Sequence, residues 1–221
     1  ENGKASGGKN DLLKAELALQ EKQLAVAEKN KLYDRLALDC APQLKKLEEL
    51  TLRGDSRRLS EAEMTERMAM ICVLCAYIKR RSNLFLMAER FSEISVRELE
   101  YALAELLDNI RLTGTVCASD FKCSGQCEAD LLIALFDACE DAVSRLIFHM
   151  DALLLKLTAD SDGIYLRLQI DTEKELSMEK QGKWEKLGGI RKVKREGDTM
   201  WIFFTFQNVK KIRKGDADAL I

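Results

Sequence analysis

The feature that most constrains this chain is a heptad pattern near its N-terminus. Apolar residues recur there at every seventh position: Leu12, Leu19, Val26, Tyr33, Cys40 and Leu47. This spacing, with further apolar residues three or four positions away, predicts one long helix over Leu12–Leu50 with a narrow apolar stripe. Such a helix is too long to be buried by a small domain, so it needs a partner helix. Pro42 should bend it locally, because proline removes one amide donor.

A second long helix is predicted to begin at a capping box formed by Ser60 and Glu63. Its apolar residues have the same spacing: Met64, Met68, Ile71, Cys75, Ile78 and Phe85. Two helices with matching stripes, joined by a turn at residues 53–58, predict an antiparallel hairpin. One hairpin leaves its stripes half exposed, so we predict that two copies form a four-helix bundle. The simplest alternative is a coiled coil that serves only as a scaffold.

Composition narrows the class of protein. The formal net charge is −2, so nucleic acid is not a predicted partner. The chain has seven cysteines, an odd number, and this favours reduced thiols in a cytoplasmic protein over a disulfide framework. No apolar run is long enough to span a bilayer. Because the chain opens without methionine, we interpret it as a fragment, and any membrane anchor would lie outside the sequence.

The second half changes period and predicts alternating helices and strands. A capping box at Ser95 and Glu98 should start a helix that Gly114 ends. The later elements are a strand at Thr115–Phe121, a loop at Lys122–Gln126, a helix at Leu131–Met150, strands at Leu153–Thr158 and Ile164–Ile170, a helix at Glu173–Lys186, and a hairpin of Ile190–Arg195 and Met200–Phe206. This order predicts an α+β fold with helices on one face of a mostly antiparallel sheet. The expected division is a helical domain at residues 1–92, a sandwich at 93–209 and a tail at 210–221.

Beside this order of elements, three short stretches carry a resemblance to a known family: Leu32–Leu44, Leu135–Val143 and Leu166–Asp171. With them, residues 32–207 resemble the cytoplasmic core of bacterial sensor histidine kinases. In that family a dimeric hairpin carries the phosphoacceptor histidine, and an α/β sandwich binds ATP. The resemblance implies the same fold here, a long helical hairpin followed by an ATPase-like sandwich.

The first stretch is similar to the histidine box of the family, in which an acid follows the phosphoacceptor. Asp39 matches that acid, so the histidine position falls on Leu38, or on Ala37 with a slip of one residue. Neither side chain has a nucleophilic atom that could accept a phosphoryl group. The single histidine, His149, lies far away in the sequence, and we interpret it as an interfacial or capping residue.

The other two stretches match the nucleotide-binding boxes of the family. Asp137 falls on the general base, and Asp141 falls on the asparagine that holds Mg²⁺. Asp171 falls on the acid that reads adenine, but the two glycines and the long lid that follow it in the family are missing. Aspartate can bind Mg²⁺ through oxygen, yet it adds negative charge beside a triphosphate. An amphipathic helix with its acids facing water is the ordinary alternative for Asp137 and Asp141.

The resemblance therefore implies a signalling module that has lost its catalytic chemistry, a pseudokinase with no cofactor. The expected partners are a second copy, and an intact kinase or response regulator. The enzymatic alternative is an atypical kinase or ATPase that retains weak Mg-ATP binding through Asp137, Asp141 and Asp171. The module is expected in the cytoplasm, as a free protein or as the cytoplasmic part of a membrane-anchored sensor.

Three further clusters have less specific patterns. Cys117, Cys123 and Cys127 could supply three zinc ligands, but their spacing matches no common zinc motif, and we favour reduced thiols. The pair Cys72 and Cys75 lies inside a helix, where core packing is expected rather than redox chemistry. The basic run of residues 79–81 could bind an acidic partner, hold the second domain in one orientation, or simply face solvent.

Overall fold

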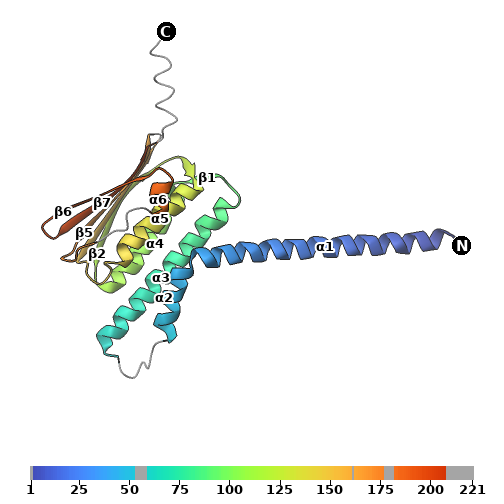
Figure 1. The fold of residues 1–221 in the computed structure, drawn as a ribbon, viewed down its shortest axis with the longest axis horizontal. Helices are drawn as coiled ribbons and strands as arrows, with labels where there is room; N and C mark the ends of the chain where they lie inside the picture. The colour runs from blue at the N-terminus through green and yellow to red at the C-terminus, as the bar shows by residue number, and fades with distance from the viewer. Residues whose placement is uncertain (1, 53–58, 161, 177–181, 208–221) are drawn as a thin grey trace, which may run out of the picture. The chain divides into compact units, whose positions relative to one another are not determined.

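The computed structural model describes residues 2–52, 59–160, 162–176 and 182–207, with side chains from residue 13 onward (Figure 1). The chain divides into two compact units, residues 1–46 and 47–221. The expected boundary between residues 92 and 93 stays a prediction. None of the described helices is both long enough and apolar enough to cross a membrane. The expected turn at residues 53–58 and the tail at 210–221 lie outside the described residues.

The N-terminal heptad region is helical, but it forms two helices rather than the single one expected. Helix α1 covers Asn2–Asp39, and α2 covers Ala41–Leu52. The break is at Cys40, two residues before Pro42, which confirms that the proline interrupts a regular helix. The apolar residues of α1 are exposed in the single chain, including Leu24 at 64% and Val26 at 58%.

Helix α3 covers Glu61–Ala88 and begins at the capping box that the sequence predicts. The Ser60 hydroxyl accepts a hydrogen bond from the Glu63 amide, and the Glu63 carboxylate accepts one from the Ser60 amide. The Nε atom of Arg67 donates to the carbonyl oxygen of Leu50, so the last turn of α2 lies beside the start of α3.

The face of α3 that is buried differs from the predicted stripe. The buried residues are Ala69, Met70, Val73, Leu74, Ala76, Tyr77, Arg81, Leu84 and Phe85, and of these only Phe85 belongs to the predicted stripe. Met68 in that stripe is 51% exposed, and Cys75 is exposed as well. At 100° per residue the two sets lie on opposite sides of the helix. The buried side packs against α4 and α5.

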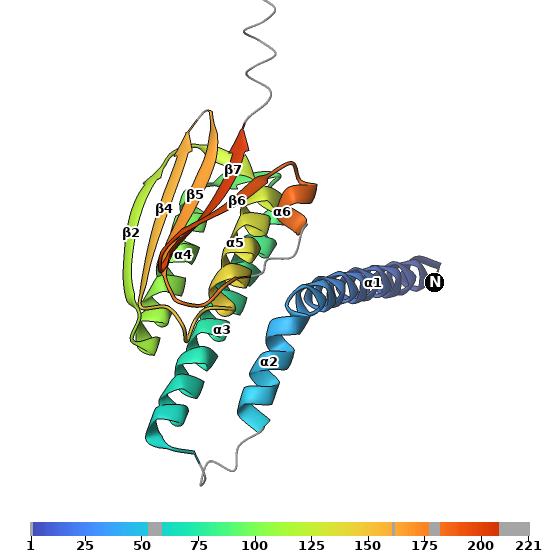
Figure 2. The same cartoon turned by 60° about the vertical axis from the view of Figure 1, so that its left-hand side comes forward.

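The second half is the α+β sandwich that the sequence predicts. A five-stranded sheet has the order β2-β4-β5-β7-β6, built from Val116–Cys123, Ala152–Asp160, Gly163–Asp171, Thr199–Gln207 and Ile190–Glu196. Strands β2 and β4 are parallel, and all other neighbours are antiparallel. Helices α4 (Arg97–Ile110) and α5 (Ala129–Ser144) cover one face, and α3 lies outside them (Figure 2). Alternate residues of the central strands, such as Leu155, Leu168 and Ile202, form the core beneath these helices.

Several predicted boundaries are wrong. Val96, rather than Ser95, is the N-cap of α4, because Glu93–Ser95 forms strand β1 and pairs with β3 at Gln126–Glu128. Strand β3 also replaces part of the predicted loop at residues 122–126. Helix α5 ends at Ser144 instead of Met150.

The stretch predicted as a helix at Glu173–Lys186 also differs. Within its described residues only Lys183–Lys186 is helical and forms α6. The predicted glycine stop is confirmed, since Gly114 (φ 88°) follows α4 and its 3₁₀ extension η2 (Arg111–Thr113). In the β6–β7 turn, Gly197 also has a positive φ of 58°.

Candidate functional site

Asp137, at the position that the resemblance gives to a general base, is held by two side chains of α3. The Tyr77 hydroxyl donates to its Oδ1 atom at 2.7 Å, and Arg81 Nε donates to the same atom at 3.0 Å. A third contact joins Arg81 Nη2 to Oδ2 at 3.4 Å. The Arg81 side chain is 3% exposed, and that of Asp137 is 24% exposed. The carboxylate therefore neutralises a buried guanidinium at the contact between two helices.

Tyr77 is placed to remain a hydrogen-bond donor at any physiological pH. Its ring stacks on Phe136, with ring centroids 5.2 Å apart. Burial raises the pKa of Tyr77 well above its ordinary value, and the negative charges of Asp137 and Glu140 raise it further. The phenol thus stays neutral beside the Asp137 carboxylate.

Asp141, one helical turn beyond Asp137, has a partner on its own helix. The carboxylate accepts from Arg145 Nε at 2.9 Å and Nη2 at 2.8 Å. The two side chains are 43% and 37% exposed, so this is a surface ion pair of small energetic weight. This placement of Asp141 matches the alternative to Mg²⁺ binding, in which the acid faces water on an amphipathic helix.

Asp171 is the last residue of β5, at the end of the strand away from the β4–β5 turn. The Thr199 hydroxyl, opposite it on β7, donates to Oδ1 at 2.8 Å. Its main-chain carbonyl accepts from the Asp151 amide at 2.9 Å. Asp137 and Asp141 share one face of α5, while Asp171 lies on a different element. Nucleotide binding by these three acids stays a prediction.

The segment after Asp171, where the family has its glycines, is fixed by Arg195 of β6. The guanidinium donates to the carbonyl oxygens of Thr172, Glu173 and Lys174, at 2.9 to 3.0 Å. Thr172 is also buried, and its amide donates to the Asp198 carbonyl at 2.8 Å. Carbonyl acceptors are thus gathered around a cation here, whereas a phosphate requires amide donors.

Sequence reasoning missed Tyr77 and Arg81 as partners of Asp137, and Arg195 as the residue that fixes the segment after Asp171. Arg81 was noticed only as part of a basic run, and Tyr77 and Arg195 had no distinguishing pattern. Each lies more than twenty residues from the group that it contacts. No local motif could have indicated these pairs.

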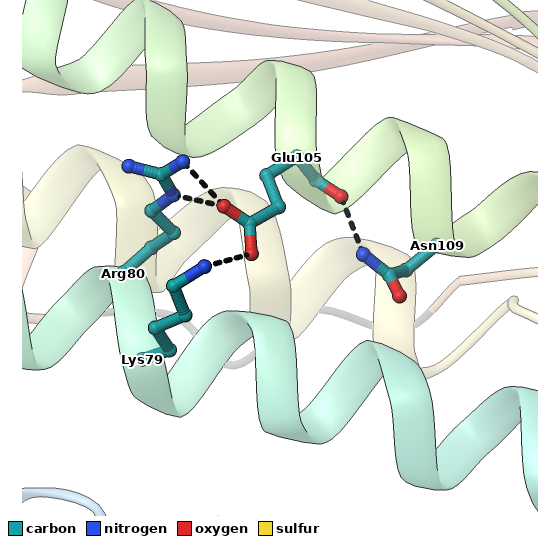
Figure 3. A network of polar contacts seen from close by, with 4 residues as sticks. All are labelled: Lys79, Arg80, Glu105 and Asn109. Carbon is teal, nitrogen blue, oxygen red and sulfur yellow. Dashed lines mark hydrogen bonds and ion pairs between the residues drawn. The ribbon is translucent and has the colours of Figure 1, made fainter.

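The basic run of residues 79–81 holds α3 against the sandwich, which was one of its three predicted roles. Lys79 Nζ lies 2.9 Å from Glu105 Oε1 on α4, and Arg80 pairs with the other oxygen of the same carboxylate (Figure 3). Arg81 makes the contact with Asp137 described above. Asn109 Nδ2 donates to the Glu105 main-chain carbonyl at 2.8 Å, within α4.

Glu105→Gln should lower the free energy of unfolding at pH 7 and leave it nearly unchanged in acid. Hydrogen bonds from Lys79, and then from Arg80, lower the pKa of Glu105. A carboxyl group with a lowered pKa in the folded state adds stability at neutral pH, and this stability is lost as the pH falls through that pKa. Because the side chain is 23% exposed, the expected difference is small, about 0.5–1 kcal/mol. Urea unfolding of both proteins at pH 7 and pH 3 measures it, and an equal difference at both values would contradict this role.

The predicted zinc alternative finds no support in the placement of the cysteines. Cys117 and Cys123 lie at opposite ends of β2, six residues or about 20 Å apart along the strand. In the described part of the chain no cluster of three or more His, Cys, Asp or Glu side chains could hold a metal ion. Burial raises the pKa of Cys123 and of Cys127 to about 11, so both remain thiols at neutral pH.

The other cysteine cluster is the pair Cys72 and Cys75, for which core packing was expected. Cys75 is exposed rather than packed in a core.

His149 lies beyond the end of α5, in an exposed turn. With Phe148, Asp151, Glu173 and Lys174 it lines a polar hollow of about 310 Å³. None of the three acids Asp137, Asp141 and Asp171 belongs to the lining of this hollow. The position of His149 is therefore that of an exposed turn residue, and it is not part of either long N-terminal helix.

No family model and no curated protein matches the sequence. Among solved structures, the chain is similar to the histidine kinase domain of the Erythrobacter litoralis EL346 blue-light activated histidine kinase. The identity is 11%, the match covers 77% of this chain and 95% of that one, and the TM-score is 0.48.

Two further similar structures are a bacterial phosphotransferase and the Acinetobacter baumannii histidine kinase AdeS. The first has 9% identity, covers 78% of this chain and 93% of that chain, and has a TM-score of 0.45. AdeS has 12% identity, the match covers 76% of this chain and 96% of AdeS, and the TM-score is 0.37. Histidine kinase domains are thus among the solved structures that this chain is similar to, as the resemblance in its sequence predicted. At these identities the likeness concerns the arrangement of helices and strands, and says nothing of activity.

Proposed function

We propose that this chain is a catalytically inactive signalling module of the sensor histidine kinase type, which acts through dimerisation and partner binding. The observation that carries this proposal is the engagement of Asp137 by Tyr77 and Arg81. A general base needs a carboxylate that is free to accept a proton from a reacting group. Here the Asp137 carboxylate is ion-paired with the buried guanidinium of Arg81. Protonation of Asp137 would remove this ion pair.

The position expected for the phosphoacceptor supports the same proposal. Leu38 lies on α1 and is 74% exposed, so a reactive group at this position would be accessible. Leucine has no atom that can attack phosphorus.

The residues at the expected nucleotide positions also fit Mg-ATP poorly. Asp141 and Asp171 are engaged by Arg145 and Thr199, and Arg195 turns the following carbonyls towards itself. A triphosphate would meet carboxylates and carbonyl oxygens where it needs amide donors. We therefore expect no nucleotide cofactor.

Dimerisation is supported by the two apolar faces of α3. One face packs on α4 and α5, while the opposite face exposes Met68, Cys75 and Leu86. Apolar side chains grouped on an exposed helix face mark a contact surface, so the second face predicts a partner. Helix α1 exposes its apolar stripe in the same way. We propose a parallel homodimer through these helices, which could in turn bind an intact kinase or a response regulator.

A location in the cytoplasm is part of the proposal. All seven cysteines lie in the described part of the chain, and all are free thiols. Free thiols, several of them accessible, fit a reducing compartment.

Calorimetric titration with millimolar Mg-ATP should give no heat of binding, and the same ligand should give no thermal shift. Each lost hydrogen bond between a phosphate and an amide removes about 1.5–3 kcal/mol, so the loss of three weakens a micromolar site beyond millimolar. The control is Asp171→Ala, which should behave like the parent protein in this titration. A thermal shift of several degrees that disappears in Asp171→Ala would instead identify an ATP-binding module, the enzymatic alternative.

A further inference from the structure

A cavity of about 560 Å³ lies at the end of the sandwich where β5 begins, and none of the three acids discussed above belongs to its lining. Strand β5 begins at this cavity with Gly163 and ends at Asp171, eight residues or about 26 Å away. The cavity is therefore separate from the region that the kinase resemblance concerns. Its volume is within the range of small-molecule sites in proteins, roughly 300–1,000 Å³.

The wall of the cavity is formed by the two-stranded sheet of β1 and β3, which backbone hydrogen bonds hold in place. The Val96 amide donates to the Gly125 carbonyl at 3.2 Å, and the Ala129 amide donates to the Ser92 carbonyl at 3.0 Å. The Ser124 amide donates to the Ala159 carbonyl at 3.1 Å, which ties the wall to the main sheet. The cavity is thus preformed, and a ligand would not have to order it.

The lining combines an apolar floor with an acidic rim. Leu131, Ile164 and Phe206 supply apolar surface from a helix and two strands. Phe206 is supported from behind by Trp184, whose ring centroid is 6.3 Å away at an interplanar angle of 62°. These aromatic and aliphatic groups can hold an apolar body of a ligand.

The charge of the rim has a single sign. Glu93, Glu128 and Asp160 belong to the lining, and among the residues that the structure describes no Lys, Arg or His does. Glu93 and Glu128 are directly opposite each other in the antiparallel register of β1 and β3. Like charges opposite each other in a sheet are destabilising, so a cation between them would relieve their repulsion.

We infer that this cavity binds a small organic cation, with an ammonium group at the Glu93 and Glu128 carboxylates and an apolar body against Phe206. The apolar floor distinguishes such a ligand from a bare metal ion, which would leave that surface unused. The inference is independent of the proposed function, because it involves neither the nucleotide positions nor the dimer helices.

The test uses the full chain and three matched probes: 4-phenylbutylamine, the neutral 4-phenylbutan-1-ol and the anionic 4-phenylbutyrate. Titrations of the ¹⁵N-labelled protein are followed by the amide signals of Gly125, Gln126 and Cys127. We expect the amine to shift these signals with at least tenfold lower Kd than the alcohol, and the carboxylate to have no effect. The affinity for the amine should fall as salt is raised.

A double variant and a control variant test whether binding depends on the charges of Glu93 and Glu128. Glu93→Gln with Glu128→Gln keeps the shape of both side chains, and should weaken amine binding at least tenfold. The melting temperature of this double variant should be equal or higher, because the opposed charges are gone, so a loss of binding would not reflect unfolding. The control is Asp130→Asn, an exposed acid in the first turn of α5 outside the lining, which should leave binding unchanged. Equal affinity for the amine and the alcohol, unchanged binding by the double variant, or no shifts up to the solubility limit would each overturn the inference.

Discussion

Replacing Asp137 with alanine should lower the free energy of unfolding by about 3 kcal/mol, as expected when one member of a buried ion pair is removed. Arg81 is 3% exposed and cannot be rehydrated in place, so its charge would lose the ion pair with Asp137. The Tyr77 hydroxyl, which donates to the same carboxylate, would lose its acceptor as well. For a domain of this size the expected decrease in melting temperature is roughly 6–12 °C.

The reverse truncation should be milder. Arg81→Met removes the buried charge itself and fills part of its volume, while Asp137, with a 24% exposed side chain, can turn to water. We expect a loss of about 1 kcal/mol, because a carboxylate that reaches solvent has a small desolvation cost.

Urea unfolding followed by circular dichroism measures both variants. The matched control is Asp141→Asn, whose exposed pair with Arg145 should contribute less than about 0.5 kcal/mol. If Asp137→Ala left the stability unchanged, Asp137 would not be a structural residue. Its availability as a base would then have to be reconsidered, and with it the inactive-module proposal.

The second large effect is expected from Met68→Glu, which should convert the proposed homodimer into a monomer at micromolar concentration. Met68 is 51% exposed in the single chain, so the carboxylate costs the monomer nothing. In the proposed dimer the same position is desolvated twice, once in each copy. Burial of unpaired carboxylates costs several kcal/mol, and every ~1.4 kcal/mol raises the dissociation constant tenfold.

Light scattering gives the mass directly, and the far-ultraviolet circular dichroism should remain unchanged. Asn83→Glu is the control, because it places the same charge on an exposed position of α3 about 100° away from the predicted stripe. The parent protein measured as a monomer with intact helices would rule out the homodimer. A dimer that survives Met68→Glu would place the contact on other surfaces.

Local order was predictable from the sequence because it depends on neighbours in the chain. The capping box of Ser60 and Glu63 joins residues three positions apart, and the break near Pro42 follows from one missing amide. The hairpin around Gly197 and the alternation along β4 and β5 arise in the same way. These signals were sufficient to predict the order of elements from α5 onward and the α+β class.

Long-range pairing decided the rest. Heptad spacing identified residues of α3 that share a face, but it could not tell which of two apolar faces the sandwich would cover. The buried face is the one with Tyr77 and Arg81, because Tyr77 stacks on Phe136 and Arg81 pairs with Asp137 on α5. Within the predicted stripe, Met68 and Cys75 were thereby left exposed.

The candidate site shows the same division. The sequence located Asp137, Asp141 and Asp171 by their resemblance to a kinase pattern, and the missing glycines were visible in it. The side chains that contact this region were not, since Arg81 lies 56 residues from Asp137, and Arg195 lies 23 residues from Thr172, the residue after Asp171. Whether a carboxylate is a free base or half of a buried ion pair depends on what the fold packs against it, and only the tertiary structure supplies that neighbour.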